Sequence, residues 1–381
     1  MRIALDGIPL SEPRTGVGHY TFELAKALAR SSPADQFELV SPRLFTSDFD
    51  TNALEQSILN LRFNSVRANI FDRRWFVHGA SSYIKRKGID LFHGANFEVP
   101  LRRVCPSVLT VHDLSLLNWS HTHLVSRVRR AKLRLPLMVR AATMLITPTE
   151  VIRREVCDQL NVEPDRVVSI PEAPREVFRI ANPRETSEVL DRLGVKHPFF
   201  LAVGTIEPRK NLIGLLRAYR ELIKSSDSRP GLVIAGKNGW MLDDIRDEIR
   251  DAGPNEQINV TGYVTDTDLQ CLYSSCVGMV FPSLYEGFGL PPLEAMACGA
   301  PVISNDIPVL REVLGDAACF VNAESIPDLK AGMLALIENP ELRLSLSKKS
   351  LIRSSEFSWE RAAMLTLKVY STAFKRFQRS G

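Results

Sequence analysis

The chain has 381 residues, of which 45% are hydrophobic and 24% are charged. At roughly 100–200 residues per domain, this length predicts two domains, and the composition excludes a disordered chain, a collagen-like fibre and a coiled coil. No stretch approaches about 18 uninterrupted apolar residues, so the sequence predicts no transmembrane helix. Met1 is followed directly by a strand-like segment instead of a signal peptide, and we therefore expect a cytoplasmic protein.

The net charge of +4 is unevenly distributed along the chain. Residues 62–154 contain 17 Lys and Arg but only 5 Asp and Glu. This excess predicts an anionic partner for the first half, either an acidic membrane surface, a lipid phosphate or a nucleic acid. The six cysteines have no CxxC spacing, so we expect reduced thiols and no structural zinc site.

Short apolar runs alternate with helical patterns along the whole chain. In the first half, the expected strands are residues 2–6, 37–41, 89–92, 107–111 and 144–147, and the expected helices are 18–30, 73–87, 125–141 and 149–160. In the second half, the expected strands are residues 199–203, 232–235, 258–260, 278–281, 302–304 and 318–321, with helices between them. Continuous apolar runs are typical of strands buried on both faces of a parallel sheet. The alternation predicts an α/β fold with two doubly wound domains.

Two segments mark the predicted organisation of the chain. The stretch Pro171–Pro183 contains three prolines without a helical period, which indicates a linker between the domains. The segment that begins at Ser358 is a capped amphipathic helix at the end of the chain.

The strongest candidate site follows the strand 278–281. A glycine-containing loop leads into a helix whose first turn holds two prolines, so the amides of Gly287 to Leu290 point toward an anion such as phosphate. Glu286 and Glu294 bracket this turn, where each carboxylate could bind hydroxyls of a nucleotide sugar. In the alternative, purely structural interpretation, Glu286 caps the turn and Glu294 complements the helix dipole.

A second candidate is the loop Gly204–Asn211, which follows the strand 199–203. Arg209 offers a bidentate fork and Lys210 a point charge, and this pair at the carboxyl end of a parallel strand suits a diphosphate. The alternative is a solvated basic start of the next helix.

Gly16 and Gly18 precede the first helix and form a third candidate. The loop from Asp6 is too long for a dinucleotide fingerprint, and Thr21 stands where its third glycine belongs, so NAD binding is disfavoured. A glycine pair whose backbone approaches a phosphate fits better, with a flexible turn as the alternative.

His112 and His93 each end a predicted strand, where a side chain can reach a ligand, although a lone histidine is also common as a structural residue. Two DxD tripeptides, Asp48–Asp50 and Asp266–Asp268, were weighed as metal sites. The first lies in a polar loop without a strong strand before it, and the second opens a helix, where acidic residues favour the dipole. The pair at His121 and His123 has no third ligand in view, so the sequence predicts no metal site.

These motifs together resemble the retaining glycosyltransferases of family 4, which have the GT-B fold. The resemblance covers essentially the whole chain and is carried, in order, by the glycine loop 16–18, Val-His-Asp at 111–113, the cation loop 204–211, Glu286-x7-Glu294 and a last helix that begins Phe-Ser-Trp-Glu.

The resemblance implies two Rossmann-like domains that face a cleft, without a cofactor. Residues 1–175 would bind the acceptor, residues 183–357 would bind the nucleotide sugar, and the helix 358–381 would return to the first domain. Many family members carry Arg after the glycine that ends the strand, whereas this chain has Thr205, so Arg209 would replace that charge.

The resemblance also implies roles for individual residues. Glu294 would bind the ribose, Glu286 the donor sugar, and His112 would lie near the reacting carbon. The diphosphate would be held by both cations, Arg209 and Lys210, with help from the strand end and the two glycine loops, namely Gly204, Phe288, Gly289, Leu290, Gly16 and Gly18.

The implied reaction is a metal-independent, retaining transfer to a saccharide or lipid-linked acceptor. The form of the cation loop is similar to that of bacterial mannosyl- and rhamnosyltransferases of surface polysaccharide synthesis, which favours mannose from GDP-mannose. In a retaining transfer, the leaving phosphate takes the acceptor's proton on the face where the new bond forms.

Two other classes of protein remain as alternatives. A glycoside hydrolase could use Glu286 and Glu294 as its acid and base, although it would have no use for Arg209 and Lys210. A non-catalytic anion- or nucleic-acid-binding protein would use the basic region but leave the 286–294 segment unexplained, so we expect no nucleic-acid partner.

The basic amphipathic pattern of residues 123–140 predicts a helix that attaches to the anionic inner face of the plasma membrane. Arg127, Arg130 and Arg134 share one of its faces, while Leu124, Val128, Ala131 and Leu135 share another. The alternative is a helix packed on the core with a solvated basic face.

Overall fold

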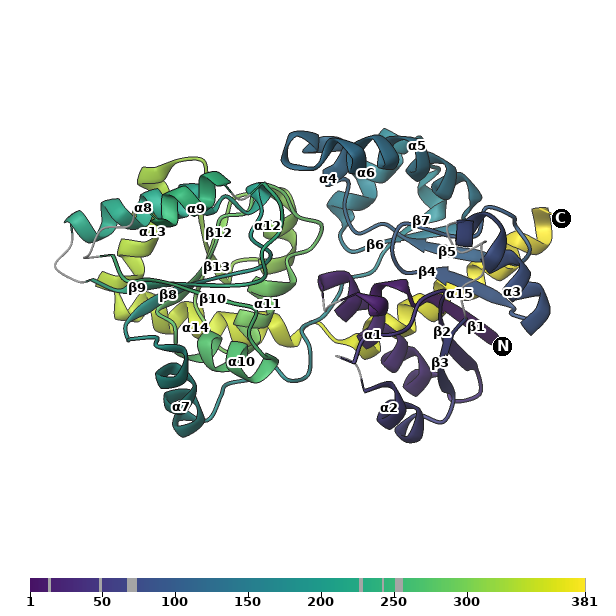
Figure 1. The fold of residues 1–381 in the computed structure, drawn as a ribbon, viewed down its shortest axis with the longest axis horizontal. Helices are drawn as coiled ribbons and strands as arrows, with labels where there is room; N and C mark the ends of the chain where they lie inside the picture. Colours follow the sequence, from purple (N-terminus) through teal and green to yellow (C-terminus); the bar gives the residue numbers. More distant parts are fainter. Residues whose placement is uncertain are drawn as a thin grey trace. The chain divides into compact units, whose positions relative to one another are not determined.

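The computed structural model describes residues 1–12, 15–47, 50–66, 74–225, 229–241, 243–250 and 256–380 (Figure 1). Its contacts divide the chain into two compact units. The first consists of Met1–Asn118, Ser126–Glu172 and Ser358–Gly381, and the second of Trp119–Val125 and Ala173–Phe357. Among the described residues, no helix is long and apolar enough to cross a membrane.

The first unit is built on a parallel sheet with the strand order β3-β2-β1-β4-β5-β6-β7. Its strands are β1 (Arg2–Asp6), β2 (Gln36–Ser41), β3 (Leu61–Ser65), β4 (Leu91–Gly94), β5 (Ser107–Thr110), β6 (Met144–Thr147) and β7 (Val167–Ser169). Strands β4, β5 and β6 are buried along their whole length, because helices cover both faces of a doubly wound sheet.

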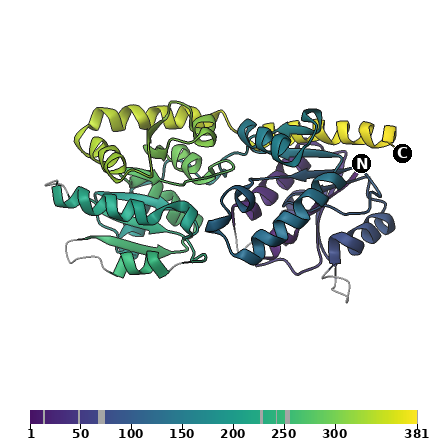
Figure 2. The same cartoon turned by 90° about the horizontal axis from the view of Figure 1, so that it is seen from above.

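The helices of the first unit include its last element in sequence. They are α1 (Gly16–Ser31), α2 (Thr51–Ser57), α3 (Ala80–Lys87), α4 (Ser115–Asn118), α5 (Val125–Ala141), α6 (Glu150–Leu160) and α15 (Trp359–Ser380). Helix α15 packs along α1. Figure 2 shows it in yellow, running along the first unit to the C-terminus. Its Tyr370 hydroxyl lies 2.7 Å from Nδ1 of His93 on β4, so a buried hydrogen bond ties the end of the chain to the first sheet.

The second unit repeats the scheme with the strand order β10-β9-β8-β11-β12-β13. Its strands are β8 (Phe199–Val203), β9 (Gly231–Ala235), β10 (Ile258–Gly262), β11 (Gly278–Phe281), β12 (Val302–Asn305) and β13 (Ala318–Val321). Its helices are α7 (Pro183–Leu193), α8 (Leu212–Ser225), α9 (Asp243–Arg250), α10 (Asp266–Ser275), α11 (Leu290–Ala297), α12 (Pro308–Leu314), α13 (Ile326–Glu338) and α14 (Pro340–Ser355). Apolar side chains of α8, α9 and α13 cover one face of this sheet, and those of α10, α11 and α12 cover the other.

The predicted fold class, an α/β fold with two doubly wound parallel sheets, is confirmed. The sequence reading missed the edge strand β3, where only Leu61 is buried, and β7, which has three residues. It also read Pro183 as part of a linker, whereas Asn182 caps α7 and Pro183 begins it. The predicted strand 89–92 lies at Leu91–Gly94, and the predicted helix 73–87 begins at Ala80 after a π-helical turn at Trp75–Gly79.

Candidate active site

The two loops that carry the strongest motifs meet at the carboxyl end of the second sheet. Strands β8 and β11 are parallel neighbours, with Met279 opposite Leu201, so the loops that follow them emerge side by side. The backbone amide of Leu284 donates to the carbonyl oxygen of Arg209 at 2.9 Å and joins the loops directly. The cation loop and the Glu286 loop therefore form one site.

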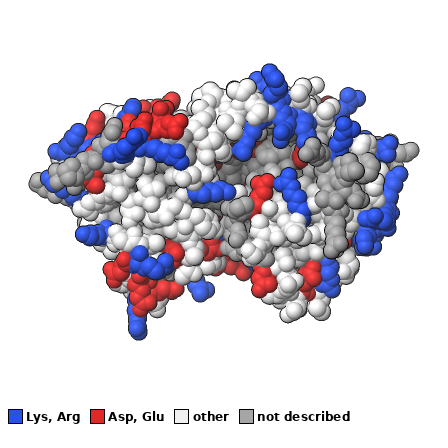
Figure 3. Space-filling model, in the orientation of Figure 1, with Lys and Arg blue, Asp and Glu red and all other residues white. Residues whose placement is uncertain are grey.

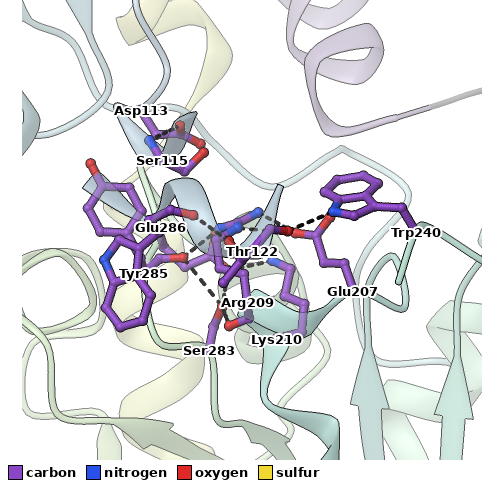
Figure 4. Close-up of polar contacts among 11 residues, drawn as sticks. Asp113, Ser115, Thr122, Glu207, Arg209, Lys210, Trp240, Ser283, Tyr285 and Glu286 are labelled. Carbon is purple, nitrogen blue, oxygen red and sulfur yellow. Dashed lines mark hydrogen bonds and ion pairs between the residues drawn. The ribbon is translucent and has the colours of Figure 1, made fainter. Parts of the chain in front are cut away.

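Glu286 is the centre of this site and is 8% exposed (Figure 4). Its Oε1 accepts a hydrogen bond from the Ser283 hydroxyl at 2.6 Å and is paired with Nζ of Lys210. Its Oε2 lies 3.1 Å from Nη1 of Arg209. Burial alone would raise the pKa of Glu286, but Lys210 and Arg209 outweigh burial and lower this pKa to about 2. The carboxylate is therefore ionised at neutral pH.

Arg209 is shared between two carboxylates. Besides Glu286, its Nη2 donates to Oε1 of Glu207 at 2.7 Å, and Nη1 donates to the carbonyl oxygen of Tyr285. Glu207 is 3% exposed and had no role assigned from the sequence, although it stands within the cation loop. The guanidinium is held in place before any ligand binds, which is the preorganisation that a charge-stabilising group needs.

Gly204 begins the cation loop because the backbone requires it. Its φ of 142° lies in a region that L side chains rarely adopt. The carbonyl of Gly204 also lies so close to Gly236, which follows β9, that a Cβ at residue 236 would come within 1.8 Å of its oxygen. Both glycines keep the ends of β8 and β9 close together beneath Lys210.

Asn305 supports the same loops from the end of β12. Its Nδ2 donates to the carbonyl oxygen of Ser283 at 2.9 Å, and its Oδ1 accepts from the amide of Ala323 at 3.0 Å. Asn211 of the cation loop donates to the carbonyl oxygen of Ala323 at 2.7 Å. The sequence analysis assigned neither asparagine a role, although Asn305 is a polar residue at the end of a buried strand and Asn211 ends the cation loop.

The glycine loop after Glu286 leads into α11. Gly289, with a φ of 102°, caps the helix, and a Cβ there would lie 2.8 Å from Leu310. Phe288 is buried and packs edge-to-face on Phe357 with ring centroids 5.9 Å apart. The first amides of α11, beginning with Leu290, have no partner within the helix, as at any helix start. The predicted turn is therefore a helix N-terminus, and its binding of an anion stays a prediction.

Glu294 lies on the same helix and is 5% exposed. Its Oε1 accepts from Nε of Arg175 at 2.8 Å, and Oε2 accepts from Nη2 at 3.4 Å. Nη1 of Arg175 reaches Oδ1 of Asp266 at 2.8 Å. The two glutamates thus pair with different cations. Glu286 pairs with Arg209 and Lys210 of the cation loop, whereas Glu294 pairs with Arg175 from the segment that the sequence predicted as a linker.

His112 belongs to the first unit and follows β5. Its Nε2 donates to the carbonyl oxygen of Ala95 at 2.8 Å, and its Nδ1 lies 3.3 Å from Oε1 of Glu172. Burial lowers the pKa of His112, but the contact with Glu172 outweighs burial and raises it above the ordinary value. The Tyr20 ring contacts the imidazole edge-to-face at 4.7 Å. Glu172, like Arg175, was overlooked within the proline-rich segment.

The other predicted residues of the first unit lie in two places. Gly16 is the first residue of α1, and the amide of Gly18 donates to the Thr15 hydroxyl, which caps this helix. His93 is fully buried between the hydroxyls of Tyr370 and Thr110, and burial lowers its pKa to about 3. His93 is therefore a neutral structural residue.

Comparison with known proteins identifies the class of enzyme. The family model described as "Glycosyltransferase Family 4" matches residues 14–173, and "Glycosyl transferases group 1" matches residues 187–351. The chain is 31% identical to O-antigen chain mannosyltransferase B of Escherichia coli, over 97% of this chain and 99% of that protein. The chain belongs to glycosyltransferase family 4. This glycosyltransferase is also 32% identical to the serotype-specific mannosyltransferase WbdA of Escherichia coli, over 60% of its own length and 28% of that of WbdA.

Solved structures show the same fold as this glycosyltransferase. HepE of Anabaena, solved in complex with UDP and glucose, aligns with a TM-score of 0.73 and 16% identity over 98% of this chain and 100% of HepE. WaaG, a glycosyltransferase involved in lipopolysaccharide biosynthesis, aligns with a TM-score of 0.74 and 13% identity over 96% of this chain and 98% of WaaG. The predicted GT-B fold is confirmed, and no comparison supports the hydrolase alternative.

The two DxD tripeptides differ in what the structure says of them. Asp266 is paired with Arg175, and Asp268 completes a capping box with Thr265 at the start of α10. Asp48 lies outside the described residues. Within the described part of this glycosyltransferase, no group of three or more His, Cys, Asp or Glu side chains could hold a metal ion.

Proposed function

We propose that this glycosyltransferase is a retaining mannosyltransferase that moves mannose from GDP-mannose to a saccharide or lipid-linked acceptor in cell-surface polysaccharide synthesis. Mannosyl transfer and the pathway are supported by the O-antigen mannosyltransferase of Escherichia coli and by RfbU of Salmonella typhimurium, an O-antigen chain mannosyltransferase with 27% identity over 64% of this chain and 62% of RfbU. The choice of GDP as the nucleotide rests on the form of the cation loop. The observation that carries the proposal is the ionised Glu286 held beside two cations at the carboxyl end of the second sheet.

In this proposal, Lys210 and Arg209 stabilise the negative charge that develops on the leaving diphosphate. Both side chains are largely buried, where an ionic contact is stronger than in water. Glu286 keeps them in place in the free enzyme and binds hydroxyls of the donor sugar when the phosphate takes over the cations. The acceptor's proton passes to the leaving phosphate oxygen as the new glycosidic bond forms on the same face of the sugar.

Further residues have proposed roles in binding the donor. Glu294 binds the ribose hydroxyls, and the amides of Phe288, Gly289 and Leu290 bind phosphate oxygens at the start of α11. His112 of the first unit contacts the donor sugar near the reacting carbon. Its raised pKa favours the imidazolium, whose two N–H groups face Ala95 and Glu172, so His112 would act on the sugar through its positive charge and its ring edge.

We also propose that the reaction needs no divalent metal, since Arg209, Lys210 and the positive end of α11 supply the charge that a metal would otherwise supply. Thr205, which stands where relatives carry an arginine, leaves this work to Arg209. The contact of Arg209 with Oε2 of Glu286 supports that substitution.

The proposed location is the anionic inner face of the plasma membrane, reached through α5. Figure 3 shows Lys and Arg gathered over α5 in the first unit. The structure changes the details that the sequence predicted, because Leu135 is buried and Arg134 pairs with Glu98 at 2.6 Å. Exposed apolar side chains of α5 are Leu133 and Leu137, together with Val125 at its first residue. These two leucines lie one turn apart, so they can enter the interface together.

The test begins with thermal-shift measurements on GDP, UDP, dTDP and ADP, because a ligand of the folded state raises the melting temperature. We expect GDP to give the largest increase. Transfer from GDP-mannose to a mannose-containing acceptor is then followed by NMR, and an α-linked product would support retention. A β-linked product would contradict it, and a larger shift with another nucleotide would contradict the donor assignment.

A further inference from the structure

Arg175 is a buried arginine that the proposed chemistry has not used. It lies between β7 and α7 and is 8% exposed. Nε and Nη2 hold the two oxygens of Glu294 on α11, and Nη1 holds Asp266 in the first turn of α10. One guanidinium therefore connects three segments that are distant in sequence.

The surroundings of Arg175 hold its side chain in one position. Its Cζ lies 4.5 Å from the ring centroid of Phe178, and that ring packs edge-to-face on Tyr273 at 5.5 Å. Burial lowers the pKa of Arg175, but Glu294 and Asp266 outweigh burial and raise this pKa above the ordinary value. The guanidinium is thus a permanent cation, and a rotation would break contacts to both carboxylates.

We infer that Arg175 is a positioning residue, which orients Glu294 for the ribose hydroxyls and neutralises its charge so that an anionic nucleotide sugar can bind beside it. This inference rests on the proposed role of Glu294. A carboxylate has about four lone-pair sites, and the fork of Arg175 occupies one on each oxygen. The fork thereby fixes the plane of the Glu294 carboxylate, and this plane sets the direction from which a ribose hydroxyl can approach it.

The charge of Arg175 gives it an effect on donor binding that a purely structural ion pair would not have. Without Arg175, a buried Glu294 would either repel the diphosphate of the donor or take up a proton. A neutral Glu294 still forms hydrogen bonds but no longer repels an anion. Donor binding would then depend on pH, whereas the loss of a purely structural ion pair would weaken binding equally at each pH.

Other titratable groups lie near Glu294 and Arg175. They are the hydroxyl of Tyr273 on α10 and the thiol of Cys298 after α11, together with Asp266, which faces Arg175. Burial raises the pKa of Tyr273 and of Cys298, so both remain neutral near neutral pH. A pH response in a variant that lacks Arg175 can therefore be assigned by also replacing Glu294.

The experiment measures binding of the nucleotide sugar preferred by the wild type, by calorimetry without acceptor, at about pH 5.5 and about pH 8.5. An intact nucleotide sugar is chosen because its diphosphate diester keeps the same charge at both pH values. Because the raised pKa of His112 lets the proposed sugar contact respond to pH by itself, each variant is compared with the wild type at the same pH. Arg175→Gln should bind about tenfold more weakly at the higher pH and recover most of the loss at the lower one.

Matched variants complete the test. Arg179→Gln changes an exposed arginine of the same segment and should bind as the wild type does. Adding Glu294→Gln to Arg175→Gln should abolish the pH response. Should Arg175→Gln fail to fold by circular dichroism, Arg175→Lys retains the charge without the fork and should bind more weakly at both pH values alike.

The outcomes separate the two proposals. If the wild type binds the nucleotide sugar and Arg175→Gln binds it normally, the inference is wrong but the proposed function stands. The same holds if Arg175→Gln binds more weakly by the same factor at both pH values. Normal affinity in Arg175→Lys overturns the orienting role. A wild type that binds no nucleotide sugar overturns the proposed function and, with it, the inference.

Discussion

At the scale of single residues, the two glutamates of the motif differ in their partners. Glu286 is paired with the cations of a loop that we assign to phosphate, and Glu294 with an arginine outside that loop. This difference predicts different losses. Glu286→Gln should keep nucleotide binding but lose transfer, whereas Glu294→Ala should lose nucleotide binding. Calorimetry and a transfer assay on both variants test the division, and equal loss of binding in both would contradict it.

Lys210 should contribute mainly to turnover. Its ammonium is nearly buried, pairs with Glu286 and lies 5.0 Å from the ring of Phe281, so a ligand phosphate would meet a fixed charge. Lys210→Ala should lower kcat by about 10²–10³. Lys196→Ala, at an exposed position, is the control. A change confined to KM would assign Lys210 to binding alone.

The pKa of Glu286 also predicts how stability depends on pH. The neighbouring cations lower this pKa from 4.5 to about 2, so the folded protein binds the proton less tightly than the unfolded chain. The ionised carboxylate therefore stabilises the fold above pH 4.5, and this contribution is lost as the pH falls toward about 2. Melting temperatures of Glu286→Gln should decline less steeply across this window than those of the wild type, while exposed Glu188→Gln should follow the wild type.

Two buried tyrosines offer a matched test of hydrogen bonding in the core. Both are fully buried, but the hydroxyl of Tyr370 is bonded to His93, whereas that of Tyr273 has no hydrogen-bond partner among the described residues. Tyr370→Phe should lower the free energy of unfolding by about 1–3 kcal/mol, since it leaves Nδ1 of His93 without its partner. Tyr273→Phe should leave stability equal or higher. Urea denaturation measures the free energy of unfolding of both variants, and an equal decrease in both would contradict this account.

At the scale of secondary-structure elements, α5 is the part of the first unit that we assign to the membrane. Leu133 is 67% exposed and Leu137 is 54% exposed, and basic side chains flank them on the same helix. An apolar pair can enter the membrane interface, and each Lys or Arg near an anionic surface adds about 1 kcal/mol of favourable binding free energy. Leu133→Glu with Leu137→Glu should abolish sedimentation with vesicles that contain anionic lipid, and high salt should weaken the wild type.

A control distinguishes membrane attachment from general damage. Leu344→Glu changes an exposed leucine of α14 in the second unit and should leave vesicle binding unchanged. Wild-type protein that does not sediment at low salt would show that α5 is simply a surface helix.

The more deeply a strand is buried, the more readily it could be predicted from the sequence. The continuously apolar strands β8, β9 and β11 were found because burial on both faces leaves them few polar residues. The edge strand β3 was missed because its solvated positions hold Arg62 and Asn64, which erase the apolar signal. Helix α7 was missed because a proline suits both a linker and a first helical turn.

The residues of the candidate site that lie in loops directly after strands could be predicted from the sequence. The residues whose partners are distant in sequence could not. Glu286, Lys210 and Arg209 were found because their loops follow buried strands. Arg175 and Glu172 could not be found, since their partners Glu294 and His112 lie far along the chain and only the tertiary structure brings them together. A polar residue in a proline-rich segment carries no periodic signal of burial.

At the scale of the whole molecule, the enzyme's positive charges predict that transfer needs no divalent metal. The proposed leaving diphosphate is met by Lys210, Arg209 and the start of α11, all in the second unit. We therefore expect transfer to continue in excess EDTA, with a metal-dependent glycosyltransferase in the same buffer as a control for the chelator. If activity were lost in EDTA and restored by magnesium or manganese, the cations would be insufficient. Glu207 and Glu286 would then have to be reconsidered as metal ligands, because they are the carboxylates nearest to Arg209.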